Sequence, residues 1–209
     1  MNVITTGSSK GGCGKTSLTI NLAVCATKRG LKVVIVDADK LGSAETWWDI
    51  RKENGFEAPT VVGTKPARIE KTLHSLNERG FDLCFVDTGA GEIEAVNSAA
   101  KFSDLIIVPL RASSFDALAT MATADALERH NGRTWTVVNA LKHYANYAGP
   151  IMSAFSARGI QVCPITVGDY VEFTNAANVG MGVLETKPRG QAAHDMVLLQ
   201  DWLLSRLKD

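Results

Sequence analysis

Residues 10–16 of this 209-residue chain, Lys10-Gly11-Gly12-Cys13-Gly14-Lys15-Thr16, form its most specific local pattern. It follows a short apolar run, Val3 to Thr6, and precedes a helix-like run from Ser17 to Ala23. A glycine-rich turn between a strand and a helix can curl its backbone N–H groups around an anion, and the start of the helix adds positive potential. We therefore predict a phosphate-binding loop over these residues, completed by Ser17 in the first turn of the helix.

Two side chains of this loop have the chemistry that a nucleotide site needs. The Lys15 ammonium would reach the β- and γ-phosphates, and the Thr16 hydroxyl would bind a magnesium ion. The general pattern G-x-x-x-x-G-K-[ST] is nearly met, except that Ser9 replaces its first glycine and a second lysine, Lys10, follows. The alternative is a surface turn with two solvated lysines, which the flanking strand and helix disfavour.

The composition is that of an ordinary globular protein. Apolar residues make up 45% and charged residues 21%, so we expect one domain over residues 1–209 and no long disordered segment. Lys plus Arg and Asp plus Glu number 22 each, so any DNA binding must come from a local patch. The four cysteines show no C-x-x-C spacing, which argues against a disulfide framework or a zinc site.

The sequence enters its first expected strand at once, without a basic segment followed by a long apolar run. Its apolar runs are all shorter than the ~20 residues that a membrane helix needs. We therefore expect no signal peptide, no membrane association and a cytoplasmic location.

Beyond the loop, apolar β-branched runs alternate with helical runs. The expected strands are residues 32–37, 58–63, 81–87, 104–109, 134–139 and 160–165. The expected helices are residues 66–79, 92–101, 114–130, 144–158 and 190–207. Strands that are apolar throughout are buried on both faces. Their alternation with helices predicts a doubly wound α/β fold, with a mostly parallel sheet and helices on both faces.

Carboxylates follow two of the expected strands, and in such a sheet ligands bind beyond the carboxyl ends of the strands. Asp37 and Asp39 end one strand, where they can hold magnesium-bound water and orient an attacking water. Capping of the next helix is the alternative for this pair. Asp87 ends a second apolar strand, the pattern of a carboxylate that binds magnesium beside phosphate. The expected metal ligands are therefore Thr16, Asp37 and Asp87.

With its additional lysine, the loop resembles the deviant Walker A loop, K-G-G-x-G-K-[ST], of the ParA/MinD family of ATPases. The resemblance covers Val3 to Leu207 and is most like the small ParA-type partition ATPases without an N-terminal DNA-recognition domain. It implies a P-loop NTPase fold, ATP and Mg²⁺ as cofactors, and a slow, partner-stimulated hydrolysis of ATP. It also implies a homodimer formed on ATP binding, in which Lys10 reaches the phosphates of the other subunit.

The resemblance assigns three further residues. Asp39 matches the second Asp of the family's D-x-D-P-Q segment, which activates or positions water, so Asp39 joins Lys10 and Lys15 as an expected catalytic residue. Asn139, at a strand end, is expected to read the adenine edge with its amide, and a simple turn residue is the alternative. Pro188 is expected to pack against the base.

Two segments depart from the family pattern. Lys40 and Leu41 stand where the family has Pro and Gln, and Gly89 and Ala90 replace the two prolines of D-T-P-P-G. These departures leave open a nucleotide switch that hardly hydrolyses ATP.

The function implied by the resemblance is partition of plasmid or chromosome DNA. The ATP dimer would bind DNA nonspecifically on the nucleoid, and a centromere-binding or ParB-like partner protein would stimulate it. The alternative is positioning of a protein cargo, such as a chemotaxis cluster or a carboxysome. An electron-transfer relative is disfavoured, because such proteins need a C-x-x-C or cysteine ligands at a dimer axis. The basic residues that could meet DNA phosphates are Arg129, Arg133, Lys142, Arg158, Lys187, Arg189, Arg206 and Lys208.

Overall fold

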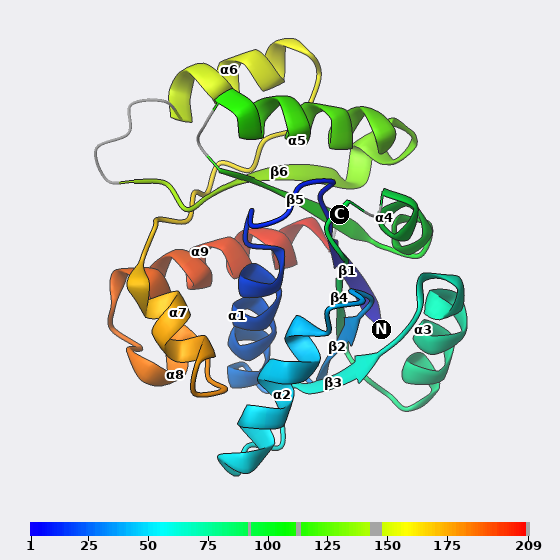
Figure 1. Ribbon diagram of the computed structural model, residues 1–209, viewed down its shortest axis with the longest axis vertical. Helices are drawn as coiled ribbons and strands as arrows, with labels where there is room; N and C mark the ends of the chain where they lie inside the picture. Colours follow the sequence, from blue (N-terminus) through cyan, green and yellow to red (C-terminus); the bar gives the residue numbers. More distant parts are fainter. Residues whose placement is uncertain (92, 112–113, 143–147, 208–209) are drawn as a thin grey trace.

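Six strands form one sheet in the computed structural model, which describes residues 1–91, 93–111, 114–142 and 148–207. Their order is β3-β2-β4-β1-β5-β6, and every pair of neighbours is parallel (Figure 1). The predicted doubly wound α/β fold is confirmed. The strands are β1 (Asn2–Thr6), β2 (Val33–Asp37), β3 (Thr60–Gly63), β4 (Leu83–Asp87), β5 (Leu105–Arg111) and β6 (Thr134–Asn139).

Helices cover both faces of the sheet (Figure 1). Helices α1, α2 and α9 contribute to the core on one face, and α3 to α6 contribute to the cores on the other. The helices are α1 (Lys15–Lys28), α2 (Ser43–Glu53), α3 (Ile69–Glu78), α4 (Ile93–Ala100), α5 (Ser114–Ala126), α6 (Ala148–Ala157), α7 (Val171–Ala177), α8 (Val183–Thr186) and α9 (Gln191–Arg206), with 3₁₀ turns η1 (Pro66–Arg68) and η2 (Glu128–Arg133).

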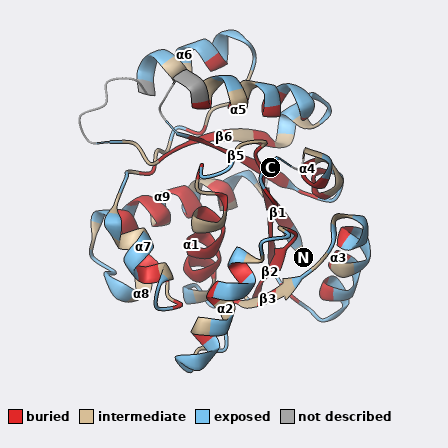
Figure 2. Cartoon of the chain, in the orientation of Figure 1, coloured by how far each residue is buried: buried red, intermediate tan, exposed pale blue. Residues whose placement is uncertain are grey.

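Successive strand residues face opposite layers of helices, because side chains alternate along a strand. Ile35 and Phe85 lie in the core with α1 and α9, whereas Val34, Val36 and Cys84 lie in the core with α3. Both sets are buried, and the strands are coloured accordingly in Figure 2. The continuous apolar strands of the sequence are thus explained by helices on both faces.

Residues 160–165, predicted as a strand, do not form one. The segment runs beside β6 and makes an isolated parallel bridge between Thr136 and Val162. The Cys163 N–H donates to the Thr136 carbonyl oxygen at 2.8 Å. The ladder then stops, because the Ile165 N–H turns to the Cys163 Sγ at 3.4 Å and the Val138 carbonyl oxygen accepts the Val167 N–H instead, at 2.9 Å.

Several helix boundaries also differ from the prediction. The expected helix 114–130 ends at Ala126 and is followed by η2, and the expected helix 66–79 begins as η1. The described part of the expected helix 144–158 is α6, and residues 143–147 lie outside the described residues. Sequence analysis does not predict α2, α7 or α8, of which α7 and α8 are too short to show a helical period. Among the described residues, every helix is too short or too polar to span a lipid bilayer.

Candidate functional site

The register of the sheet brings the ends of four strands into one row. Thr6 of β1 pairs with Asp87 of β4, Asp87 pairs with Asp37 of β2, and Asp37 pairs with Gly63 of β3. The P-loop, defined here as residues 9–16, follows β1 at this same edge. The predicted phosphate loop and the predicted carboxylates therefore meet at the carboxyl edge of a parallel sheet, where ligands bind in this architecture.

Glycine 14 allows the P-loop to turn into α1. Gly14 has a φ of 92°, in the left-handed region, and is the N-cap of α1. A Cβ atom at Gly14 would lie 2.2 Å from Nδ2 of Asn139, and this nitrogen donates to the carbonyl oxygen of Cys13 at 2.8 Å. Only glycine fits such a turn and such a close approach. The structure thus places Asn139 against the P-loop backbone, and its reading of adenine stays a prediction.

The two lysines of the P-loop are held differently. Lys15 is buried, and its Nζ donates to the carbonyl oxygen of Lys10 at 3.0 Å. The Lys10 ammonium instead pairs with the carboxylate of Asp116, in the first turn of α5. The Lys10 side chain is 41% exposed and that of Asp116 is 12% exposed, so water reaches this ion pair from the lysine side. Sequence analysis misses Asp116, because no local motif marks it.

Ser9, which replaces the first glycine of the general pattern, ties the P-loop to two neighbours. Its hydroxyl lies 2.9 Å from the Thr123 hydroxyl of α5, and the two share a hydrogen bond. Its carbonyl oxygen accepts the Gly91 N–H, in the loop after β4, at 3.0 Å. The Ser9 N–H also donates to the Thr123 hydroxyl at 3.2 Å, a contact that a glycine would keep, so the serine side chain strengthens the link to α5.

Asp87 is fully buried, and only one of its oxygens is bonded. The Thr16 hydroxyl donates to Oδ2 at 2.6 Å, whereas Oδ1 is buried and has no hydrogen-bond partner among the described residues. Burial raises the pKa of Asp87 to about 7, although the Thr16 hydrogen bond and the Lys15 charge act in the opposite direction. An unpartnered buried carboxylate oxygen beside a threonine hydroxyl is a place for a cation.

Asp37 is also buried, but both of its oxygens are bonded. Oδ1 accepts the Asp39 N–H at 3.0 Å, and Oδ2 accepts the N–H groups of Ala44 and Glu45 at 2.9 Å and 3.0 Å. Burial raises the pKa of Asp37, and these backbone hydrogen bonds oppose the shift. Asp37 therefore caps the first turn of α2, the alternative that the sequence left open, and its role as a metal ligand stays a prediction.

Asp39 lies farther out in the loop after β2. It is partly exposed, and its Oδ1 accepts the Leu41 N–H at 3.0 Å. Asp39 and Lys40 line a hollow together with Thr64 and Lys65, which follow β3. The carboxylate is thus open to solvent at the edge that carries the P-loop, and its catalytic role stays a prediction.

The remaining predicted site residues differ in how close they lie to the P-loop. Ser17 belongs to the first turn of α1, where its carbonyl oxygen accepts Nδ2 of Asn21 at 2.8 Å. Cys13 is buried, with Sγ 3.4 Å from the carbonyl oxygen of Lys10. Pro188 is exposed in the turn between α8 and α9, and its contact with a base stays a prediction.

These residues fit a magnesium ion that is bound together with phosphate. In the part of the chain that the structure describes, no three His, Cys, Asp or Glu side chains gather to hold a metal by themselves. Mg²⁺ usually takes one or two protein oxygens and completes its shell with phosphate and water. The Thr16 hydroxyl and the unpartnered Oδ1 of Asp87 supply that small set of ligands.

Known proteins share this architecture. The chain is 25% identical over 195 residues to maintenance of carboxysome distribution protein A of Halothiobacillus neapolitanus, across 90% of this chain and 89% of that protein. It is similar to a chain of the MinC:MinD cell division complex of Aquifex aeolicus, with a TM-score of 0.80 and 17% identity over 98% of this chain and 96% of that one. MinD of Pyrococcus horikoshii in complex with Mg-ADP gives a TM-score of 0.77 and 17% identity over 100% and 98%. At these identities the two structural matches show the fold.

A family model described as VirC1 protein matches residues 1–130, more than half of the chain. The matched region contains the P-loop and the carboxylates Asp37, Asp39 and Asp87. The chain therefore belongs to the VirC1 family, within the ParA/MinD family of P-loop ATPases.

Proposed function

We propose that this protein binds ATP with Mg²⁺ at the P-loop edge and acts as a positioning ATPase. The observation that carries the proposal is the buried, unpartnered Oδ1 of Asp87 next to the Thr16 hydroxyl and the Lys15 ammonium. Thr16 and Asp87 would hold the magnesium ion, which would neutralise phosphate charge. Lys15 would exchange its contact with the Lys10 carbonyl oxygen for phosphate oxygens.

Hydrolysis and dimerisation are assigned to the two groups at the rim of the site. Asp39, partly exposed beside the P-loop edge, would orient the attacking water. Lys10 would leave Asp116 and reach the phosphates of a second subunit, forming a homodimer across the two P-loops. Support comes from the position of the Lys10 side chain, which is 41% exposed at the rim of the site.

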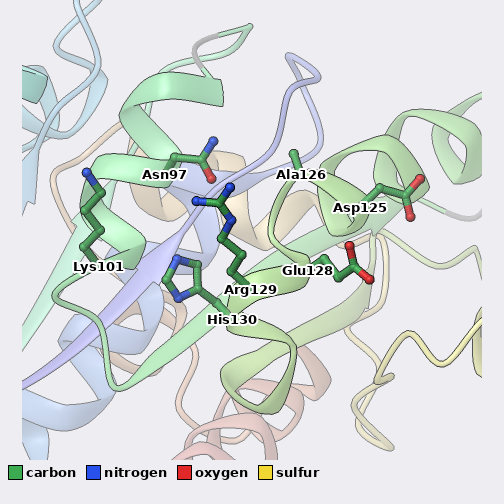
Figure 3. Close-up of a pocket in the computed structure, with 7 residues that line it drawn as sticks. All are labelled: Asn97, Lys101, Asp125, Ala126, Glu128, Arg129 and His130. Carbon is green, nitrogen blue, oxygen red and sulfur yellow. The ribbon is translucent and has the colours of Figure 1, made fainter.

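Nonspecific DNA binding is assigned to two exposed cations, Lys101 and Arg129, which line a hollow of mixed charge at the opposite edge of the sheet (Figure 3). Lys101 lies between α4 and β5, and Arg129 and His130 lie in η2, directly before β6. All three are therefore near the amino-terminal ends of strands. In Figure 3 the Arg129 guanidinium lies in the middle, with Lys101 and His130 on one side and the carboxylates of Asp125 and Glu128 on the other. Lys101 and Arg129, which are exposed, would contact phosphates without reading bases.

The central experiment is sedimentation velocity with ADP, with ATP-Mg, and with ATP-Mg plus nonspecific DNA. The proposal expects a monomer with ADP, a dimer with ATP-Mg, and a larger DNA-bound species. Lys15→Ala should abolish nucleotide binding, and Lys10→Ala should weaken dimerisation and hydrolysis but spare binding by the monomer. An unchanged mass with ATP-Mg in the wild type would refute the dimer mechanism.

The DNA surface is tested by Lys101→Ala and Arg129→Ala, with Lys71→Ala in α3 as a matched exposed cation on another surface. The first two should weaken DNA binding and lower the slope of log affinity against log salt by about one each. Equal effects of all three variants would place the DNA contact elsewhere.

The proposed cargo is plasmid or chromosome DNA, held through a centromere-binding or ParB-like partner protein. A protein cargo is the second candidate, favoured by the similarity to a carboxysome distribution protein along 90% of this chain. A gene deletion discriminates between a DNA cargo and a protein cargo. Two quantities are measured in the deletion strain, the retention of plasmids and the spacing of fluorescently labelled protein clusters. Loss of plasmids with normally spaced clusters supports partition, and the reverse supports a protein cargo.

A further inference from the structure

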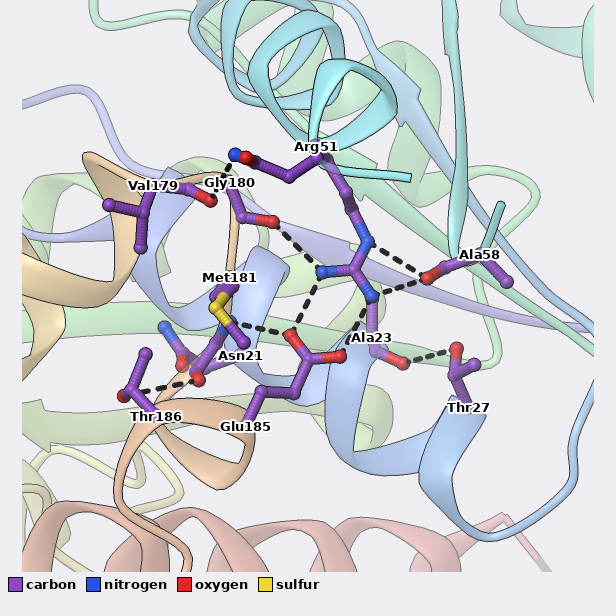
Figure 4. A network of polar contacts seen from close by, with 12 residues as sticks. Asn21, Ala23, Thr27, Arg51, Ala58, Val179, Gly180, Met181, Glu185 and Thr186 are labelled. Atoms are coloured by element: carbon purple, nitrogen blue, oxygen red, sulfur yellow. Dashed lines mark hydrogen bonds and ion pairs between the residues drawn. The ribbon is translucent and has the colours of Figure 1, made fainter. Parts of the chain in front are cut away.

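A buried ion pair joins α2 to the segment between α7 and α9. Arg51 is 1% exposed, and its guanidinium donates to both carboxylate oxygens of Glu185, each at 2.8 Å (Figure 4). It also donates to the carbonyl oxygens of Gly180 at 2.9 Å and Ala58 at 2.8 Å. One face of the guanidinium lies 4.3 Å from the centroid of the Phe56 ring. Because the guanidinium is planar and bonds to all of these oxygens, its orientation is fixed.

One face of α2 bonds to three consecutive carbonyl groups of this segment. The donors are Trp47, Arg51 and Asn54, and the acceptors are the carbonyl oxygens of Met181 at 3.2 Å, Gly180 at 2.9 Å and Val179 at 3.1 Å, respectively. The spacing of the donors, four and then three residues, places them on one side of the helix. A Cβ atom at Gly180 would lie 2.5 Å from the backbone nitrogen of Arg51. The backbone of the segment therefore rests directly on α2.

The same segment is tied to the helix that follows the P-loop. The Val183 N–H donates to Oδ1 of Asn21 in α1 at 2.8 Å, and Nδ2 of Asn21 donates to the carbonyl oxygen of Ser17 at 2.8 Å. Ser17 comes directly after the P-loop residue Thr16. The Gly182 N–H donates to Oε2 of Glu185 at 3.0 Å. Residues 179–185 thus bridge α1 and α2.

The other end of α2 begins at the candidate site. Its first N–H groups, those of Ala44 and Glu45, are held by Asp37. A continuous chain of polar contacts therefore runs from the P-loop to the end of β2. It passes through α1, residues 179–185 and α2, and it ends at Asp37. A shift of that strand-end loop relative to the P-loop has to move α2, and residues 179–185 with it.

We propose that Arg51 and Glu185 are positioning residues for the ATP site. They hold α2 against α1 so that the loop from Asp37 to Asp39 keeps its place beside the P-loop, and they pass changes in that loop to residues 179–185. This inference rests on the proposed ATPase function. Separating the two helices would leave a buried charge unpaired, which is far more costly than moving them together. Neither side chain contacts the P-loop in the described contacts, so each acts through α2.

Two variants separate positioning from folding. Arg51→Met/Glu185→Met replaces the pair by apolar side chains, an exchange that proteins often tolerate. Arg51→Lys keeps the charge but loses the two-pronged geometry. The matched control is Arg29→Met/Asp201→Met, which removes a partly exposed ion pair between the end of α1 and α9 that involves no residue of α2.

The readout is amide hydrogen exchange of residues 179–185, with and without ATP-Mg, together with affinity for ADP and the rate of ATP turnover. In the wild type and in the control, ATP-Mg should slow exchange in α2 and in residues 179–185 together. In both Arg51 variants the response of residues 179–185 should be lost, ATP turnover should fall about tenfold or more, and ADP affinity should stay within about twofold. A merely structural loss would raise exchange equally with and without nucleotide.

A second arm needs no nucleotide. Asp37→Ala removes the acceptor at the start of α2, so it should speed exchange of residues 179–185 in a chain with the ion pair. In the Arg51→Met/Glu185→Met background the same change should leave those residues unaffected. Equal acceleration in both backgrounds, or an ATP response that survives loss of the pair, would overturn the inference. A wild type that binds no ATP-Mg would refute the proposed function alone, because this arm would still report the coupling.

Discussion

Asp87 and Asp37 are register partners at the ends of β4 and β2, and both are buried, yet their oxygens are bonded differently. Asp37 accepts three backbone N–H groups and has no oxygen left without a partner. Asp87 accepts one hydroxyl, from Thr16, and its Oδ1 has no partner among the described residues. Two carboxylates that each end an apolar strand thus differ in how many hydrogen-bond donors they accept.

The difference separates a structural carboxylate from one that is prepared for a ligand. A buried carboxylate that backbone N–H groups satisfy stabilises the local fold, here the start of α2. A buried carboxylate that lacks a partner costs free energy until a cation or proton reaches it. Four measurements test this distinction, from the largest to the smallest expected change in the free energy of unfolding or of ATP binding.

The largest expected effect is on the pH dependence of stability without nucleotide or magnesium. The pKa of Asp87 is raised from 3.8 to about 7 in the folded state, so the folded state keeps a proton that the unfolded state releases. Its contribution to stability is complete below pH 3.8 and is lost as pH rises through about 7. The loss is on the order of 4 kcal/mol at most.

Urea unfolding between pH 5 and pH 8 measures this dependence. Asp87→Asn should flatten the curve, apart from a smaller slope of the same sign from Asp37, whose pKa is also raised. Identical curves for the wild type and Asp87→Asn would contradict the assignment.

The next effect is on nucleotide affinity. Asp87→Asn should weaken ATP binding about 10- to 100-fold when magnesium is present, because an amide is a poor ligand for the cation. In EDTA the variant and the wild type should bind ATP alike, as measured by isothermal titration calorimetry. A loss of affinity of the same size in EDTA would show that Asp87 acts on the loop itself.

Asp37→Ala should lower the free energy of unfolding by about 1–3 kcal/mol, because three backbone N–H groups lose their acceptor. Asp37→Asn, which keeps one acceptor oxygen, should cost less. Chemical unfolding gives both values. If Asp37→Ala reduced magnesium-dependent ATP affinity more than it reduced stability, Asp37 would be a metal ligand and the comparison would fail.

The smallest effect on stability is expected at Asp39, which is partly exposed and accepts one N–H, from Leu41. Asp39→Asn should change the free energy of unfolding by less than about 0.5 kcal/mol. It should nevertheless abolish ATP hydrolysis and trap an ATP dimer, detected by phosphate release and light scattering. An unchanged rate of phosphate release would transfer the catalytic role to another group.

The sequence predicts much of the fold and of the site because both depend on local patterns. The spacing in the P-loop and the apolar runs that end in Asp37 and Asp87 identify the loop, the parallel sheet and the edge where they meet. The predicted strand at 160–165 fails because its backbone leaves β6 after Cys163, where the Ile165 N–H turns to the Cys163 Sγ and Val167 bonds to Val138 instead. The expected helices do not include α2, because Gly42 at its start has no side chain to mark a cap, and the Asp37 cap that the sequence left open comes from seven and eight residues earlier.

Neighbouring residues alone suffice to predict the phosphate-binding loop, because a glycine-rich turn between a strand and a helix is a local pattern. The tertiary structure alone decided which carboxylate is satisfied, that Lys10 pairs with Asp116, and that Arg51 meets Glu185, 134 residues away. Desolvation and the choice of partner depend on segments that fold together from distant parts of the chain, so no local pattern encodes them.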